Sequence, residues 1–125
     1  MKNFAGQRVL IADGNESIRA LLARVFKLSG VLVDEASCSQ EALGLLGNPC
    51  KQYALAIIDL RLPGLGGREI SETLRRDRPS VSVLMLDSTG EERLDGRECL
   101  AKPFALAALK ARISSLSQGR LLAAC

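Results

Sequence analysis

The chain of 125 residues contains no histidine. This absence excludes the Ser/His and Cys/His pairs of nucleophilic catalysis and the usual zinc sites, because each of these depends on an imidazole. Any chemistry must therefore rest on Asp, Glu, Lys, Ser or Thr side chains.

Paired cysteine motifs are also absent. The cysteines, Cys38, Cys50, Cys99 and Cys125, are scattered without the CxxC spacing that zinc cages and redox pairs use. We therefore expect reduced and mostly buried thiols.

Long apolar runs are missing as well. No stretch approaches the roughly 20 apolar residues that a membrane span needs. The start of the chain, MKNFAGQRVL, lacks the apolar stretch of a signal peptide. We expect a cytoplasmic chain that makes no membrane contact.

The excess of positive over negative charge is small. The 17 Lys and Arg against 14 Asp and Glu leave a net charge of +3, which is too mild to imply nucleic-acid binding without a concentrated patch. The nearest patch, LRRDRP at residues 74–79, lacks interleaved aromatics and is typical of a solvated helix end, where cations favour the helix dipole. We expect no direct contact with nucleic acid.

The composition, with 47% hydrophobic and 25% charged residues, is typical of one globular domain. Short β-like runs alternate with helical patterns, which predicts a parallel sheet with helices on both faces. The strands are expected at residues 8–12, 31–36, 53–59, 81–86 and 99–101. We expect a single domain over residues 1–125, with a core at about 7–117 and a fraying tail at 118–125.

Helical spacing accounts for the segments between these strands. A helix is expected over residues 15–30 and a second over 39–48, capped by Ser39 and ended by Gly47. A short third helix places Ile70 and Leu74 on one face. The apolar residues at helical spacing in the last helix are Leu106, Leu109, Ile113 and Leu116.

Polar residues follow four of the expected strands. Asp13 comes after the first strand and Asp59 ends the third, while Asp87 and Lys102 follow the fourth and fifth. Ligands of such sheets bind beyond the carboxyl ends of the strands, so these side chains converge if the strands are neighbours. Taken alone, Asp13 can cap a helix, Asp87 can start a turn and Lys102 can be solvated. Asp59 is different, because a carboxylate ending an apolar strand needs a cation or hydrogen-bond donors.

Three motifs in this order, RVLIADGNESIR, IIDLRLPGLGG and AKPF, resemble the receiver domains of two-component response regulators. The match in element order covers roughly residues 7–117. The resemblance implies a flavodoxin-like α/β fold, a doubly wound five-stranded parallel sheet in the order 2-1-3-4-5. It implies phosphorelay signalling with a sensor histidine kinase or a phosphotransfer protein as partner, and no enzyme activity beyond self-catalysed phosphoryl acceptance.

The resemblance also implies a role for individual residues. Asp59 would accept the phosphoryl group, Lys102 would pair with the phosphoryl oxygens and Pro103 would follow a cis peptide bond. Mg²⁺ would be held by an acid pair after the first strand, of which Asp13 is present, by Asp59 and by the backbone carbonyl of Arg61. Attack by a carboxylate depends mainly on charge neutralisation and positioning, which the metal ion supplies.

Four features depart from the family pattern and make the chain an atypical member. Gly14 stands where the second acid is expected, and Asp87 stands at the position of a Ser or Thr that binds the phosphoryl group. Cys99 replaces the switch aromatic. Between Asp87 and Lys102 the chain is about seven residues short, roughly two helical turns, which predicts a shortened or missing fourth helix.

These departures leave two functions open, a working phosphoacceptor or a degenerate pseudo-receiver that binds partners without phosphorylation. A third class, a nucleotide-binding enzyme, rests only on GLGG at residues 64–67, which lacks the GK[ST] of a P-loop and is better explained by a turn. We interpret Gly14 and Asp87 as one compensated change, in which Asp87 holds Mg²⁺ from the other side. We expect any partner surface to use the first or last helix.

Overall fold

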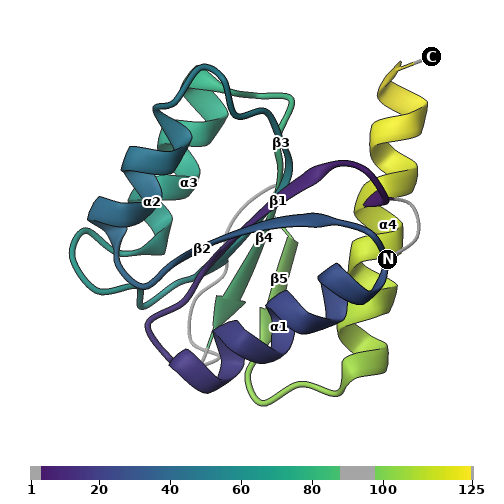
Figure 1. Ribbon diagram of the computed structural model, residues 1–125, viewed down its shortest axis with the longest axis horizontal. Helices are drawn as coiled ribbons and strands as arrows, with labels where there is room; N and C mark the ends of the chain where they lie inside the picture. Colours follow the sequence, from purple (N-terminus) through teal and green to yellow (C-terminus); the bar gives the residue numbers. More distant parts are fainter. Residues whose placement is uncertain (1–3, 88–97, 125) are drawn as a thin grey trace.

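The computed structural model describes residues 4–87 and 98–124 (Figure 1). In chain order the elements are β1 (Arg8–Ala12), α1 (Glu16–Leu28), β2 (Leu32–Ala36), α2 (Ser39–Leu46), β3 (Tyr53–Asp59), α3 (Gly67–Asp77), β4 (Ser82–Asp87), β5 (Glu98–Ala101) and α4 (Leu106–Ala124). The strands form one parallel sheet in the order β2-β1-β3-β4-β5, which confirms the predicted doubly wound topology. The shortened or missing fourth helix was predicted between Asp87 and Lys102, and residues 88–97 of this segment lie outside the described residues.

The helices cover both faces of the sheet, α1 and α4 on one face and α2 and α3 on the other (Figure 1). On the first face Leu22 of α1 and Ile113 of α4 pack into one apolar cluster with strand residues. On the second face Leu46 of α2 and Leu74 of α3 belong to a separate cluster. Because both faces are covered, β3 is buried at every position, as its continuous apolar sequence predicts.

The first two helices begin with different caps, and the cap of the second differs from the prediction. Asn15 caps α1, its side chain accepting a hydrogen bond from the backbone N–H of Ile18 at 3.1 Å. In α2 the N-cap is Cys38 and makes no side-chain cap bond, so the predicted cap by Ser39 is wrong. The Ser39 hydroxyl instead accepts a hydrogen bond from Leu65 in the loop after β3. The hydroxyl oxygen that was expected to cap α2 therefore accepts from a backbone N–H distant in the sequence.

The last helix is longer than expected. The predicted tail from residue 118 is helical as far as Ala124, because most of the residues there are good helix formers and Gly119 alone opposes the helix. Leu109 and Ile113 are buried as predicted, whereas Leu106 is 41% exposed at the first turn of the helix. None of the described helices is long and apolar enough to cross a membrane.

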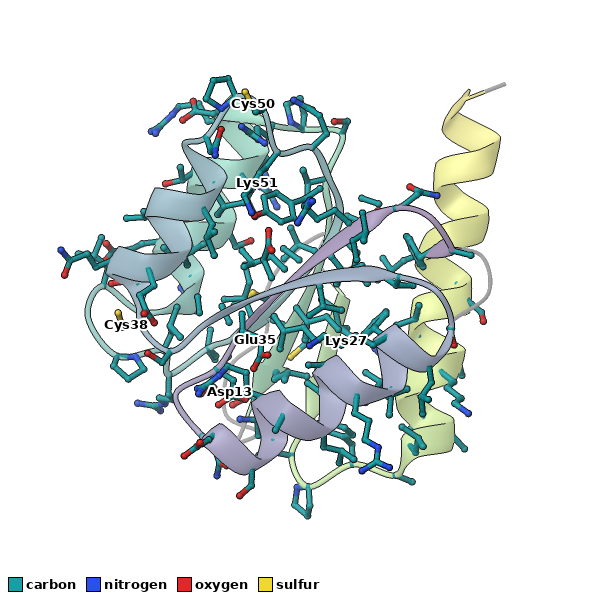
Figure 2. The ribbon with its side chains drawn as sticks, in the orientation of Figure 1. Asp13, Lys27, Glu35, Cys38, Cys50 and Lys51 are labelled. Carbon is teal, nitrogen blue, oxygen red and sulfur yellow. The ribbon has the colours of Figure 1, made fainter. Side chains whose placement is uncertain are left out.

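The cysteines are less buried than expected. Cys50 is exposed, Cys38 and Cys99 are half-buried, and all three are free thiols. Cys38 and Cys50 lie at opposite ends of α2, where the chain runs over the surface (Figure 2), so the prediction of mostly buried thiols is wrong for the described cysteines. Cys125 lies outside the described residues.

Polar side chains fix the loop between α2 and β3. Arg78, which was expected to be solvated, donates hydrogen bonds to the carbonyl oxygens of Lys51 at 2.6 Å and Asn48 at 2.9 Å. Three donors converge on Asp34 of β2: Tyr53 at 2.6 Å, Lys51 at 3.1 Å and Arg8 at 3.0 Å. Burial opposes ionisation of Asp34, but the bonds from Tyr53, Lys51 and Arg8 outweigh it and lower the pKa of Asp34.

The cluster around Asp34 predicts a pH-dependent contribution to stability. A carboxyl whose folded pKa is lowered stabilises the fold above its unfolded value, near 3.8, and this stabilisation is lost as pH falls through the folded pKa. We expect Asp34→Asn to lower the free energy of unfolding at pH 7 by about 2 kcal/mol, the scale of hydrogen bonds to charged groups. Urea unfolding at pH 7 and pH 3 checks this, with the exposed Asp77→Asn as control. An equal loss at both pH values would contradict it.

Candidate functional site

The carboxyl ends of four neighbouring strands carry the predicted site residues. Asp13 directly follows β1, Asp59 is the last residue of β3, Asp87 is the last residue of β4, and Lys102 directly follows β5. Since β1, β3, β4 and β5 are consecutive in the sheet, these residues share one edge. Figure 2 shows Asp13 at this edge, with Cys50 near the opposite end of the molecule. The three carboxyl-bearing residues are buried, with exposures of 0%, 7% and 2% for Asp13, Asp59 and Asp87.

The ammonium group of Lys102 joins two of these carboxylates. Its Nζ atom lies 2.7 Å from Oδ2 of Asp13 and 3.6 Å from Oδ2 of Asp59. The Lys102 side chain is itself only 12% exposed. Its backbone N–H donates to the carbonyl of Asp87 at 2.8 Å, which continues the ladder between β4 and β5 by one bond. The bond between Lys102 and Pro103 is cis, as the resemblance implied.

Asp13 is fixed by its backbone and by its side chain. The backbone N–H of Asn15 donates to Oδ1 of Asp13 at 2.8 Å. Arg19, one turn into α1, donates to the Asp13 carbonyl at 2.7 Å and also pairs with Glu35 of β2 at 3.3 Å. The carboxylate therefore keeps Oδ2 directed at Lys102.

Asp59 is held by the loop that follows β3. Its Oδ1 atom accepts a hydrogen bond from the backbone N–H of Arg61 at 3.1 Å. Burial raises the pKa of Asp59; the Arg61 bond and the Lys102 charge lower it, and the Asp13 carboxylate raises it again. The net result is a pKa above the usual value, chiefly because burial opposes the charged form of the carboxyl.

The position of the missing second acid is closed by a proline ring. A Cβ atom added at Gly14 would lie 2.9 Å from Cδ and 3.0 Å from Cγ of Pro63. These distances are below van der Waals contact, so any side chain at residue 14 would require the loop after β3 to move.

The donor chemistry of this edge fits Mg²⁺. Mg²⁺ prefers oxygen ligands and is bound in proteins through one or two carboxylates with several retained waters. The carboxylates of Asp13 and Asp59 and the backbone carbonyl of Arg61 are the groups that would hold it. Among residues 4–87 and 98–124, no three acidic or cysteine side chains are placed to form a metal cage, so side chains would supply a pair of ligands rather than three.

The charge of Asp87 acts on Cys99 of β5. Burial raises the pKa of the Cys99 thiol and the Asp87 carboxylate raises it further, while Arg112 lowers it. Arg112 also donates from α4 to the Cys99 carbonyl at 2.6 Å. Two ion pairs thus join Asp13 and Asp59 to Lys102, and the charge of Asp87 acts on Cys99, which stands at the position of the switch aromatic.

Some residues of the site were not anticipated from the sequence. Asn15 and Arg19 hold Asp13 through a backbone N–H and a guanidinium, and the Pro63 ring lies against Gly14. Asn15 directly precedes an apolar helix, which predicts a cap. The bond from its backbone N–H to Asp13 depends instead on the turn between β1 and α1. The contact of Pro63 with Gly14 joins segments far apart in the sequence and has no local signal.

The central ion pair predicts a large effect of removing its cation. Lys102→Met leaves two buried carboxylates without their ammonium, and breaking a buried pair in this way costs about 3 kcal/mol or more. We expect that loss in the free energy of urea unfolding at pH 7. Lys110→Met, on the exposed side of α4, is the control and should change stability little. Equal effects of the two variants would contradict a structural role of Lys102.

Comparisons with known proteins agree with this geometry. Residues 9–114 match the family model of the response regulator receiver domain. The chain is 33% identical over 118 residues to the response regulator RppA of Synechocystis sp., covering 89% of this chain and 50% of that protein. It is 33% identical over 121 residues to the transcriptional regulatory protein TcrA of Mycobacterium tuberculosis, covering 91% and 47%. The chain thus spans about half the length of these relatives.

A solved structure shows the same fold. The response regulator protein TrrA of Thermotoga maritima, crystallised in complex with Mg²⁺-BeF, is 27% identical and superposes with a TM-score of 0.78 over 88% of this chain and 98% of that one. The strand order, the carboxylates at the sheet edge and these matches lead to one conclusion. The chain belongs to the family of response regulator receiver domains.

Proposed function

We propose that this receiver domain accepts a phosphoryl group on Asp59 from a sensor histidine kinase or phosphotransfer protein in the cytoplasm. The observation that carries the proposal is the buried trio of Asp13, Lys102 and Asp59, in which one ammonium faces two carboxylates. The Mg²⁺-BeF complex of the similar protein TrrA supports it. Mg²⁺ would be held by Asp13, Asp59 and the carbonyl of Arg61.

The transfer is a displacement at phosphorus. A carboxylate oxygen of Asp59 forms the new P–O bond while the P–N bond to the donor imidazole breaks, and the imidazole nitrogen leaves with the bonding electron pair. Bound Mg²⁺ would supply neutralisation of the charge on the phosphoryl oxygens. Lys102 would exchange its contact with Asp59 for a phosphoryl oxygen and so follow the negative charge. Arg61, through its N–H bond to Oδ1, keeps the acceptor carboxylate oriented.

The alternative function is a pseudo-receiver that binds its partner without phosphorylation. Gly14 favours it, because Pro63 closes the position of a metal ligand. Asp87 favours it as well, because an anion replaces a hydroxyl donor. The two functions differ in a simple result, which is whether a small phosphodonor labels the chain.

The first prediction for this function concerns Asp59. We expect acetyl phosphate with Mg²⁺ to label the wild-type chain and to leave Asp59→Asn unlabelled, because the amide is not nucleophilic toward phosphorus. Intact-protein mass spectrometry measures the added phosphoryl group. Asp77→Asn, an exposed aspartate on α3, is the matched control and should be labelled like wild type. Equal labelling of wild type and Asp59→Asn would exclude Asp59 as acceptor, and no labelling of either would favour the pseudo-receiver.

A second prediction separates two roles of Asp87. If Asp87 is a Mg²⁺ ligand, Asp87→Ala weakens Mg²⁺ binding and slows labelling. If it only repels, a carboxylate about 4 Å from a phosphoryl oxygen costs about 4 kcal/mol at an effective dielectric of 20, and Asp87→Thr speeds labelling. We propose the second role, because among the described residues Asp13, Asp59 and Asp87 do not form a group of three that could hold a metal ion.

Calorimetric titration with Mg²⁺ and labelling time courses decide between these roles. We expect unchanged Mg²⁺ affinity in Asp87→Ala and faster labelling of Asp87→Thr. Asp87→Asn removes the charge without adding a hydroxyl, and it separates relief of repulsion from a new hydrogen bond. Weaker Mg²⁺ binding by Asp87→Ala would restore the compensation hypothesis.

A further inference from the structure

The carboxylate of Asp13 is part of a closed turn at the end of β1. Its Oδ1 atom accepts a hydrogen bond from the backbone N–H of Asn15 at 2.8 Å, so the side chain and the two following residues form a ring of the Asx-turn type. The carbonyl carbon of Asp13 and the backbone of Gly14 are members of this ring. The direction of the carboxylate therefore depends on the peptide group that joins Asp13 to Gly14.

Gly14 gives this ring more conformational freedom than another residue would. It has no Cβ atom to restrict φ and ψ. Its φ is not positive, so the backbone of the turn does not require a glycine. Gly14 is also exposed and has no side chain that could anchor it. The peptide group between Asp13 and Gly14 is therefore held by contacts from other parts of the chain.

Arg19 of α1 makes such a contact. Its Nη1 atom donates to the carbonyl oxygen of Asp13 at 2.7 Å, and that oxygen is bonded directly to a carbon atom of the ring. Its Nε atom lies 3.3 Å from Oε1 of Glu35 on β2, and the Arg19 side chain is only 17% exposed. The planar guanidinium can serve both partners at once because its donors point in fixed directions. Glu35 thus holds the group that holds the turn.

We infer that Arg19 is a positioning residue for Asp13, because its bond to the Asp13 carbonyl fixes the turn that aims the carboxylate. The second carboxylate oxygen, Oδ2, lies 2.7 Å from Nζ of Lys102, so the aim of the turn also sets this ion pair. The inference rests on the proposed function where Mg²⁺ is concerned. Its structural part, the restraint of the turn by Arg19, requires no metal ion.

The charge and the hydrogen bond of Arg19 affect Mg²⁺ binding in opposite directions. A guanidinium near the site repels a divalent cation, so removal of a residue that acted by charge alone would tighten Mg²⁺ binding. Mg²⁺ demands a strict ligand geometry, so removal of a residue that positions Asp13 would weaken Mg²⁺ binding. The sign of the change in affinity therefore separates the two roles.

The first experiment is titration calorimetry of Mg²⁺ with the full chain. We expect Arg19→Met to weaken Mg²⁺ binding about five-fold, the scale of one hydrogen bond. Arg24→Met, at an exposed arginine of the same helix, is the matched control and should not weaken binding. Glu35→Gln removes the ion pair but leaves the bond from Arg19 to Asp13, and it should change the affinity less than about two-fold, because the pair is partly exposed. Unchanged or tighter binding by Arg19→Met, or equal weakening by Glu35→Gln, would overturn the inference.

Amide hydrogen exchange, followed by NMR without metal, tests Arg19 independently of the proposed function. We expect the N–H of Asn15, which is bonded to Oδ1 of Asp13, to exchange at least three-fold faster in Arg19→Met, on the order of a local opening of the turn. The N–H of Asp13, which donates to the carbonyl of Ala36 at 3.0 Å, is the internal reference and should keep its protection. Unchanged exchange at Asn15, or equal acceleration of both amides, would overturn the inference. Mg²⁺ that binds neither wild type nor variant would contradict the proposed function and leave the exchange rates to decide on Arg19.

Discussion

The ammonium group of Lys102, placed between Asp13 and Asp59, is the interaction on which this structure depends. It joins the chain after β5 to the chain after β1, 89 residues apart, at 2.7 Å. Without it, a fully buried carboxylate and a nearly buried one would face each other, with the backbone N–H groups of Asn15 and Arg61 as the donors that the described residues supply. The apolar layers on both faces of the sheet bring the strands together. The ion pair with Lys102 allows the carboxyl ends of these strands to carry buried carboxylates.

The same interaction connects stability to chemistry. One cation for two carboxylates leaves the pKa of Asp59 raised, first by burial and then by Asp13, so further positive charge is favourable there. A bound divalent cation would add positive charge beside the two carboxylates. A phosphoryl group would draw Lys102 away from Asp59 and so change the same charge balance. On one side the loop that carries Arg61 and Pro63 holds Asp59 through the Arg61 N–H. On the other side Asn15 and Arg19 hold Asp13 through hydrogen bonds.

Much of the fold could be predicted from the sequence, because local patterns encode it. The buried strand Tyr53–Asp59 is a continuous apolar run, and the alternation of elements predicts the parallel sheet, whereas its strand order came from the resemblance to receiver domains. Asp59 and Lys102 could be located because polar residues at strand ends are few. The hydrogen bond between Ser39 and Leu65 and the contact between Pro63 and Gly14 could not, since they depend on how distant segments pack against the loop after β3. The exposed thiol of Cys50 likewise depends on surroundings that a sequence window does not contain.

The central claim is that the trio of Asp13, Asp59 and Lys102 is a phosphoryl-acceptor site. The most direct measurement is a crystal structure of the chain with Mg²⁺ and beryllofluoride, which mimics the phosphoryl group on an aspartate. The account predicts beryllofluoride on Asp59, Mg²⁺ in contact with Asp13, Asp59 and the Arg61 carbonyl, and Lys102 moved from Asp59 to a fluorine atom. Saturating beryllofluoride that leaves Asp59 unmodified, with Lys102 still between the two carboxylates, would contradict it.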